Sequence, residues 1–137
     1  MIYITRRERF SAAHKLSNNK LSQDENLEQY GKCANEYFHG HNYQLFVTIK
    51  GEVDPEVGYV IDMKKLSLII KQNVIDLVDH KNLNVDVDFL KGINPSTENL
   101  LISFWKQLAP EIEKYSCKLH KIKLIETENN YGEYYGE

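Results

Sequence analysis

The sequence predicts an α+β domain with a four-stranded antiparallel sheet whose apolar face is covered by two helices, in the order ββααββ. Two observations support this fold class. Residues 39–49 alternate with a period of two, and residues 62–78 and 94–110 carry apolar side chains at helical spacing. With 137 residues and 42% hydrophobic content, the chain suits a single domain covering residues 1–137.

The two N-terminal strands differ in the strength of their pattern. In residues 2–12 the apolar positions alternate loosely around a charged run at 6–9, which predicts a strand with a bend. Residues 16–32 are rich in polar side chains and predict a long loop with room for a helical turn. The next strand has the clearest alternation, and one of its faces carries His39, His41, Tyr43, Leu45, Val47 and Ile49.

Two helices and a hairpin complete the predicted fold. Asp62 is a suitable N-cap for a helix that runs to about Val78. Pro95 and the hydroxyl residues after it predict a second helix, and Pro110 marks its approximate end. A terminal hairpin then follows, with its turn at residues 129–130.

Composition excludes several classes of partner. The net charge is −3 and the 17 Lys and Arg are interspersed among 20 Asp and Glu, so we expect no nucleic-acid partner. We find neither a signal peptide nor a membrane-length apolar run, and we therefore expect a soluble, cytoplasmic protein without a membrane partner. Cys33 and Cys117 are expected to be free thiols.

The sharpest local signal is His39-Gly40-His41. An i, i+2 pair on a strand directs both imidazoles to one face, and His14 can supply a third nitrogen from a neighbouring strand. Three histidines with an open fourth position are typical of catalytic zinc. The alternative is a pair of half-buried polar residues, but imidazoles on such an apolar face need partners, which favours a metal ion.

Several further residues have both a chemical and a structural interpretation. Cys33, beside Lys32 and near the candidate metal, can remove a proton as a thiolate, or it can be a small buried hydrophobe. In Asp79-His80 the carboxylate can fix the tautomer of the imidazole, or the pair can simply occupy the helix C-terminus.

For three residues in the C-terminal half of the chain a purely structural explanation is also available. Glu126 lies on the face of Ile122 and Leu124, where it can anchor ligand N–H groups or merely end the strand. Thr97 and Glu98 stand at the start of a helix, and capping with the helix dipole is enough to explain both.

Taken together, six ordered segments resemble the 6-pyruvoyltetrahydropterin synthase family. They are FSAAH (10–14), GKC (31–33), HGHNY (39–43), DHKNL (79–83), PSTEN (95–99) and ET (126–127). The resemblance spans nearly the whole chain. It implies the tunnelling fold, in which three subunits join their sheets into a barrel and two trimers stack into a hexamer with active sites between subunits.

The resemblance also implies a function and residue roles. The reaction is the conversion of 7,8-dihydroneopterin triphosphate to 6-pyruvoyltetrahydropterin with release of triphosphate, a lyase step of tetrahydrobiopterin biosynthesis. His14, His39 and His41 would bind Zn²⁺, and Mg²⁺ can assist by binding the triphosphate. Cys33 would be the proton-abstracting thiolate, and Asp79 with His80 would come from an adjacent subunit. Glu126 would hold the pterin ring, with Thr97 and Glu98 nearby.

The presence of Glu36 leaves open which pterin product the protein forms. Some relatives that cleave the side chain to 6-hydroxymethyl-7,8-dihydropterin, for folate synthesis, use a glutamate near this place, whereas Glu36 can equally be an exposed loop charge. A third branch makes 6-carboxytetrahydropterin for queuosine, often with a shorter gap between the thiol and the paired histidines. The remaining alternative is a zinc-bearing pterin-binding protein without activity. Some of Lys15, Lys32, Arg7 and Lys81 are expected to contact the triphosphate.

Overall fold

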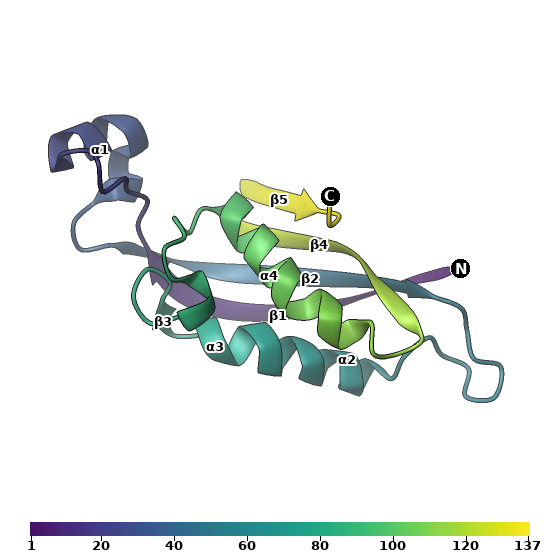
Figure 1. Ribbon diagram of the computed structural model, residues 1–137. Helices are drawn as coiled ribbons and strands as arrows, with labels where there is room; N and C mark the ends of the chain where they lie inside the picture. The colour runs from purple at the N-terminus through teal and green to yellow at the C-terminus, as the bar shows by residue number, and fades with distance from the viewer.

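A five-stranded sheet in the order β3-β1-β2-β4-β5 forms one layer of the computed structural model, which describes residues 1–137 (Figure 1). The strands are β1 (Ile2–His14), β2 (His39–Gly51), β3 (Lys81–Asn82), β4 (Cys117–Thr127) and β5 (Asn130–Tyr134). The helical segments are α1 (Gln23–Tyr30), η1 (Gly31–Ala34), α2 (Met63–Ile70), η2 (Lys71–Ile75), α3 (Asp76–Val78), η3 (Asp88–Leu90) and α4 (Thr97–Ile112).

The α+β class is confirmed, but the prediction of four strands in the order ββααββ is wrong. The fifth strand, β3, lies between the two helices in sequence and pairs parallel to Ala12 and Ala13 of β1. Backbone bonds flank it, from His80 N–H to Ser11 O at 2.7 Å and from Leu83 N–H to Ala13 O at 2.8 Å. Two residues are too short to show any period, so no pattern could predict this strand.

β1 and β2 form the longest ladder of the sheet. They pair one to one, without a bulge, from Ile2 opposite Gly51 to His14 opposite His39. The charged run at 6–9 does not interrupt β1, because it stays within the ladder. The alternation predicted for β2 is confirmed, since Tyr43 and the three apolar residues that follow it on the same face are buried.

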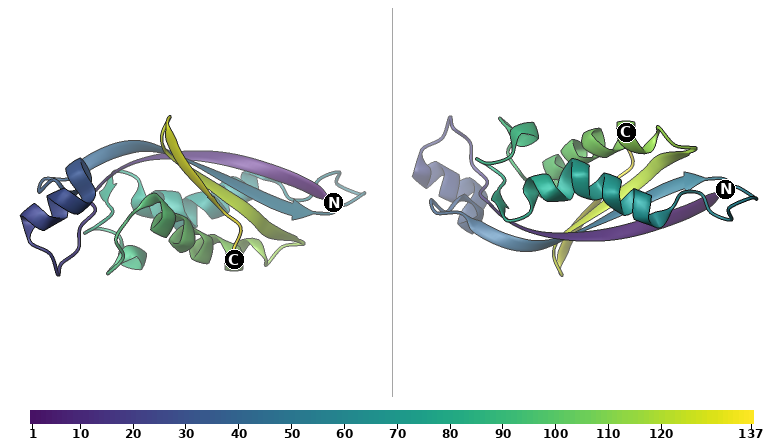
Figure 2. Two further views of the ribbon diagram at one scale, coloured as in Figure 1. Left: turned by 90° about the horizontal axis from the view of Figure 1, so that it is seen from above. Right: turned by 90° about the horizontal axis from the view of Figure 1, so that it is seen from below.

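The helices cover a single face of the sheet, and the other face has no helix on it (Figure 2). The segments α2, η2 and α3 run on continuously from the Asp62 cap to Val78, as predicted, with a π-helical turn in the middle. α4 passes through Pro110 and ends two residues later at Ile112, close to the predicted boundary. The core between the two layers includes Leu45, Val47, Ile49, Leu66, Ile70, Val74, Leu100, Phe104 and Leu108.

The segment predicted as a long loop contains α1, which lies beyond one end of the sheet (Figure 1). A capping box begins this helix, since Ser22 accepts from Glu25 N–H and the Glu25 side chain accepts from Ser22 N–H. The segment has too few apolar residues to show a helical stripe, which explains why only a turn was expected. None of the helices is both long and apolar enough to cross a membrane.

The buried carboxylate of Glu8 ties β1 to α2. Its Oε1 accepts hydrogen bonds from Ser67 Oγ at 2.6 Å and from Arg6 Nε at 2.9 Å. Burial raises the pKa of Glu8, but these hydrogen bonds and the charge of Arg6 outweigh it and hold the pKa below the usual 4.5. A carboxyl with a lowered pKa stabilises the fold above its unfolded-state value and loses that contribution as the pH falls.

We expect Ser67→Ala to lower the free energy of unfolding by about 1–3 kcal/mol near neutral pH, because it removes a hydrogen bond to a buried carboxylate. The difference from the parent should shrink as the pH falls below 4.5 and Glu8 takes up a proton. Urea unfolding across a pH series measures both effects. Ser103→Ala is the matched control, because Ser103 is as buried as Ser67 but contacts no carboxylate; an equal loss in both variants would contradict the assignment.

Candidate metal centre

Three imidazoles converge where β1 ends and β2 begins. The register places His14 opposite His39, and His41 lies two residues further along the same face of β2. Their ring centroids lie 4.6 to 5.0 Å apart, and one ligand atom from each lies within 4.8 Å of the others. The predicted triad of His14, His39 and His41 therefore exists in a geometry that can hold one metal ion.

The nitrogens that face one another have no hydrogen-bond partner. His14 Nε2, His39 Nδ1 and His41 Nε2 are all buried and unpaired. The nearest carboxylate oxygens, both on Glu126, lie 4.0 Å from His14 Nε2 and 3.8 Å from His41 Nε2, too far for a hydrogen bond. Orphaned buried polar atoms are rare in folded proteins, and three in one cluster fit a metal ion as the missing partner.

The other ring nitrogen of His14 fixes its tautomer. His14 Nδ1 lies 2.8 Å from the backbone carbonyl oxygen of Pro95, and only an N–H can donate to a carbonyl. Nδ1 therefore carries the hydrogen, which leaves the lone pair on Nε2, the atom that faces His39 and His41. A carbonyl behind a ligating imidazole is the usual supporting contact in metal sites.

Two of the three imidazoles are held in the neutral form that a metal requires. Burial lowers the pKa of His14 by more than the Pro95 hydrogen bond raises it, and the neighbouring histidines lower it further. Burial also lowers the pKa of His39, with His41 adding to the effect. The pH at which each ring is half protonated is therefore below 6.5, the usual pKa of a histidine.

The backbone between the paired histidines is uncrowded only because residue 40 is glycine. A Cβ at Gly40 would lie 3.3 Å from the carbonyl oxygen of Ala12 on β1, a contact tighter than side chains normally make. Phe38, just before the strand, has a φ of 71°, which is uncommon for a residue with a side chain. The approach to the first ligand of β2 is therefore locally constrained.

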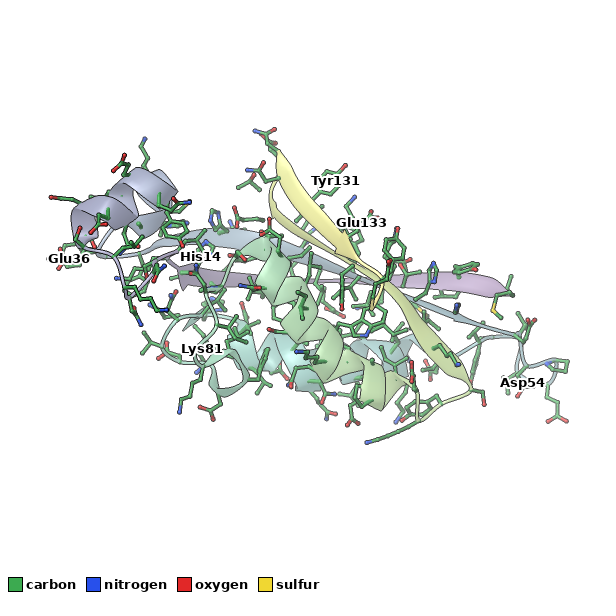
Figure 3. The ribbon with its side chains drawn as sticks, turned by 45° about the horizontal axis from the view of Figure 1, so that its top comes forward. His14, Glu36, Asp54, Lys81, Tyr131 and Glu133 are labelled. Carbon is green, nitrogen blue, oxygen red and sulfur yellow. The ribbon has the colours of Figure 1, made fainter.

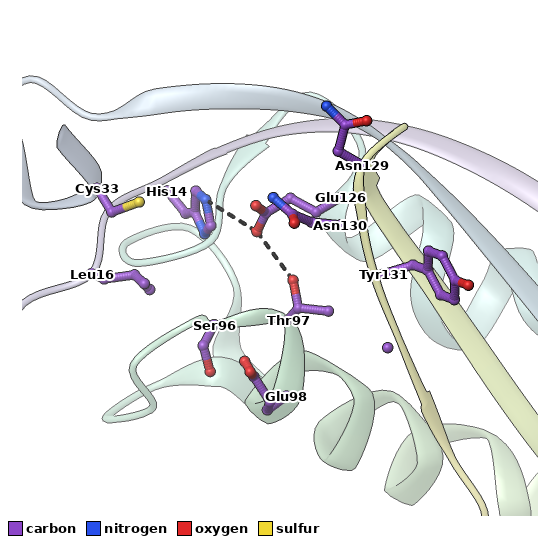
Figure 4. A pocket seen from close by; sticks show the side chains of 11 residues that line it. His14, Leu16, Cys33, Ser96, Thr97, Glu98, Glu126, Asn129, Asn130 and Tyr131 are labelled. Atoms are coloured by element: carbon purple, nitrogen blue, oxygen red, sulfur yellow. Dashed lines mark hydrogen bonds and ion pairs between the residues drawn. The ribbon is translucent and has the colours of Figure 1, made fainter. Parts of the chain in front are cut away.

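Glu126 and Thr97 form a second pair beside the imidazoles. Thr97 Oγ1 donates a hydrogen bond of 3.1 Å to Glu126 Oε2. Capping does not explain Thr97, because the side chain that caps α4 is Ser96, whose hydroxyl accepts from Asn99 N–H. The half-buried Glu126 carboxylate lies between Thr97 and the histidines, where it can accept hydrogen bonds from a ligand (Figure 4).

A pocket of about 400 Å³ opens between these groups (Figure 4). Its walls bring together five of the predicted site residues, namely His14, Cys33, Thr97, Glu98 and Glu126. They also include six that the sequence analysis missed: Leu16, Ser96, Asn129, Asn130, Tyr131 and Gly132. Four of these six belong to the β4–β5 turn and β5, whose approach to α4 no local pattern encodes. At Gly132 a Cβ would lie 2.9 Å from Leu101 Cδ1, so a larger residue there would have to displace that side chain.

Asp79 and His80 lie outside this pocket. Asp79 Oδ1 accepts from Ser11 N–H at 2.9 Å and lies 3.0 Å from His80 Nδ1, and the Ser11 bond is the main cause of a lowered Asp79 pKa. The His80 side chain is 82% exposed. It borders a separate open cleft, at the β3 edge of the sheet, together with His41. The predicted pairing of carboxylate and imidazole therefore exists, but one chain alone does not bring it to Cys33.

The remaining predicted residues also lie apart from the pocket. Glu36 is exposed in the loop before β2, and Figure 3 shows it at the α1 end of the molecule. The Lys15 ammonium lies 4.9 Å from the centre of the Phe38 ring, and Lys81 borders the cleft of His80. Arg7 is exposed on β1, seven residues before His14. No lysine or arginine lines the pocket itself.

Known proteins resemble this chain over its full length. The family model described as "6-pyruvoyl tetrahydropterin synthase" matches residues 3–137. A 6-pyruvoyl tetrahydrobiopterin synthase of Dictyostelium discoideum is 48% identical over 136 residues, which cover 99% of this chain and 97% of that protein. The solved 6-pyruvoyl tetrahydropterin synthase of Caenorhabditis elegans superposes with a TM-score of 0.88 at 40% identity, covering 99% and 96% of the two chains.

A more distant relative carries a different name. A dihydroneopterin monophosphate aldolase of Pyrococcus furiosus is 33% identical over 97 residues, which cover 71% of this chain and 76% of that protein. The resemblance to the two synthases is both closer and longer.

We expect the protein to retain one divalent metal ion per chain and His39→Asn to lose it, because the substitution removes one of three ligands. Since the pKa values of His14 and His39 lie below 6.5, metal should be released only as the pH falls below that value. Metal content after dialysis across a pH series measures both results. His120→Asn, on the opposite face of the sheet, is the control; metal retention by His39→Asn, or release above pH 6.5, would contradict the site.

Proposed function

Since this chain belongs to the 6-pyruvoyl tetrahydropterin synthase family, we propose that it is a zinc-dependent lyase acting on 7,8-dihydroneopterin triphosphate. The products are 6-pyruvoyltetrahydropterin and triphosphate. The pterin ring gains the hydrogens that the side chain loses, so the reaction needs no external oxidant or reductant. The observation that carries the proposal is the cluster of three orphaned imidazole nitrogens beside a pocket that holds a thiol and a carboxylate.

His14, His39 and His41 hold the metal in this proposal. The donor set of three imidazoles suits zinc with one position left for substrate. Zinc bound there supplies a Lewis acid that lowers the pKa of the substrate's side-chain hydroxyls. The Pro95 carbonyl keeps the lone pair of His14 on Nε2 and so keeps this ligand ready for binding.

Glu126 recognises the pterin ring. The amino group and ring N–H of a pterin form a planar pair of donors that one carboxylate can accept together. The hydroxyl of Thr97 already donates to Glu126 Oε2, which orients the carboxylate before substrate arrives. Glu98, in the first turn of α4, lies on the same wall of the pocket.

Cys33 is the base. Its half-buried thiol lines the same pocket as Glu126, so a pterin held by that carboxylate extends its side chain within the enclosure that Cys33 faces. A cation in the histidine cluster favours the thiolate, the form that removes a proton from the side-chain carbon. The imidazole of His80, oriented by Asp79, then moves protons on the other side of the substrate.

The Asp79–His80 pair reaches the substrate from a second copy of the chain. Within one chain the His80 side chain is largely exposed and neither residue lines the pocket, which supports an assembly in which a neighbour supplies the pair. We propose the hexamer of two stacked trimers that the resemblance implies. The absence of lysine and arginine from the pocket fits the same view, because the triphosphate then also meets cations from the neighbour.

A second candidate function is cleavage of the side chain to 6-hydroxymethyl-7,8-dihydropterin, with Glu36 as the base. The 33% identity to an aldolase favours keeping this candidate, and Glu36 lies in the same loop as Cys33. The exposed position of Glu36, outside the pocket, makes it the weaker proposal.

We expect Cys33→Ala to abolish triphosphate release from 7,8-dihydroneopterin triphosphate, because it removes the base. Glu36→Ala should leave both rate and product unchanged. Chromatography of the pterin products, with triphosphate assayed in parallel, measures the outcome for the zinc-loaded protein. If Glu36→Ala eliminated a hydroxymethylpterin product that Cys33→Ala still formed, cleavage would be the main activity. If the parent protein bound pterin without turnover, the lyase assignment would fail.

We expect Glu126→Gln to weaken pterin binding by about ten- to hundredfold, because it removes charge-assisted hydrogen bonds to the ring. Thr97→Val should produce a smaller loss through a less well-oriented carboxylate. The Kd for neopterin, which lacks the leaving group, isolates binding from catalysis. Glu128→Gln, an exposed neighbour in the β4–β5 turn, is the control, and an equal loss there would count against ring recognition by Glu126.

A further inference from the structure

The sheet face without helices is strongly cationic although the chain as a whole carries a net charge of −3. We call this surface the open face. Strand alternation and the ladder registers place six cations on it: Arg7, Arg9, Lys50, Lys118, Lys121 and Lys123. The strands place one carboxylate on the open face, that of Glu133 on β5, which lies opposite Lys123 (Figure 3).

Local contacts hold two of the six cations. Lys121 Nζ lies 3.5 Å from Glu133 Oε1. Lys123 Nζ lies 4.2 Å from the centre of the Tyr131 ring and 5.8 Å from that of Phe46. These contacts place aromatic rings and cations next to one another on the β4–β5 side of the open face.

The other four cations have no acidic partner within the chain. None of the ion pairs in the structure involves Arg7, Arg9, Lys50 or Lys118. Lys50 and Lys118 lie directly opposite each other on neighbouring strands. Like charges in this arrangement destabilise a sheet, and an anion that bridges them would remove the repulsion.

The chemistry of the open face limits what can bind it. Two copies of the face repel each other, so it does not fit a face-to-face contact between chains. Cα atoms of residues two apart on a strand are separated by about 7 Å, and those on neighbouring strands by about 5 Å. A small anion with several phosphoryl groups can therefore contact Arg7 and Arg9, or Lys50 and Lys118, at once.

We propose that the open face is a polyphosphate-binding surface and that its ligand is inorganic triphosphate. The choice of triphosphate rests on the proposed function, in which the protein releases this anion from a pocket that one chain lines with Glu98 and Glu126 and with no lysine or arginine. The open face lies on the other side of the sheet from that pocket, and its unpaired cations attract a polyanion once the anion is free in solution.

Calorimetric titration of the zinc-loaded protein with sodium tripolyphosphate, without magnesium, tests this assignment. Arg7→Gln/Lys50→Gln/Lys118→Gln should weaken binding by about tenfold or more, because charge-assisted contacts are lost. The matched control is Lys64→Gln/Lys65→Gln/Lys106→Gln, which removes three exposed cations from α2 and α4 and should bind like the parent. Affinity in the parent should fall as salt is added.

A second pair of titrations separates this surface from the catalytic pocket. Free triphosphate should bind His39→Asn as tightly as the parent, whereas neopterin triphosphate, which carries the same tail on a pterin, should lose affinity for the metal-site variant. Loss of triphosphate binding in His39→Asn but not in the open-face variant would overturn the proposal, as would equal losses in the open-face and control variants. If the protein bound triphosphate at the open face but did not turn over its substrate, the proposal for this surface would stand and the lyase assignment would fail.

Discussion

The rest of the structure depends on the histidine cluster, in which three imidazole nitrogens are buried beside one another without a hydrogen-bond partner. Leaving such a group unpaired costs about 1–3 kcal/mol, a large fraction of the stability of a small domain. A metal ion satisfies all three nitrogens at once, so metal binding and folding are linked at this site. The buried environment also keeps His14 and His39 neutral, which is the form that binds a metal.

The rest of the fold positions groups around that cluster. The bulge-free ladder of β1 and β2 sets His14 opposite His39, and Gly40 allows the strands to approach where the ligands lie. α4 contributes Thr97 and, just before it, the carbonyl of Pro95, while β4 contributes Glu126. Binding, orientation and proton transfer therefore come from separate elements that converge on one pocket.

Local patterns predicted the strand with His39 and His41, the two long helices and the terminal hairpin, because each has a clear period or boundary residues. They could not predict β3, which has two residues, or the contact of Thr97 with Glu126, which joins a helix to a strand 29 positions away. They could not predict the open face either, since Arg7 and Lys123 come to lie on one surface, on either side of Phe46, only once the strands pair. The exposed Asp79–His80 pair is the part of the site that one chain does not bring to the pocket.

The coordination of the metal tests the account most directly. X-ray absorption at the zinc edge, on protein loaded with one equivalent, should show three imidazole nitrogens at about 2.0–2.1 Å and a light atom in the remaining position. A sulfur neighbour at about 2.3 Å would mean that Cys33 is a ligand rather than a base. That result, or a zinc ion bound without the three imidazoles, would contradict the central claim.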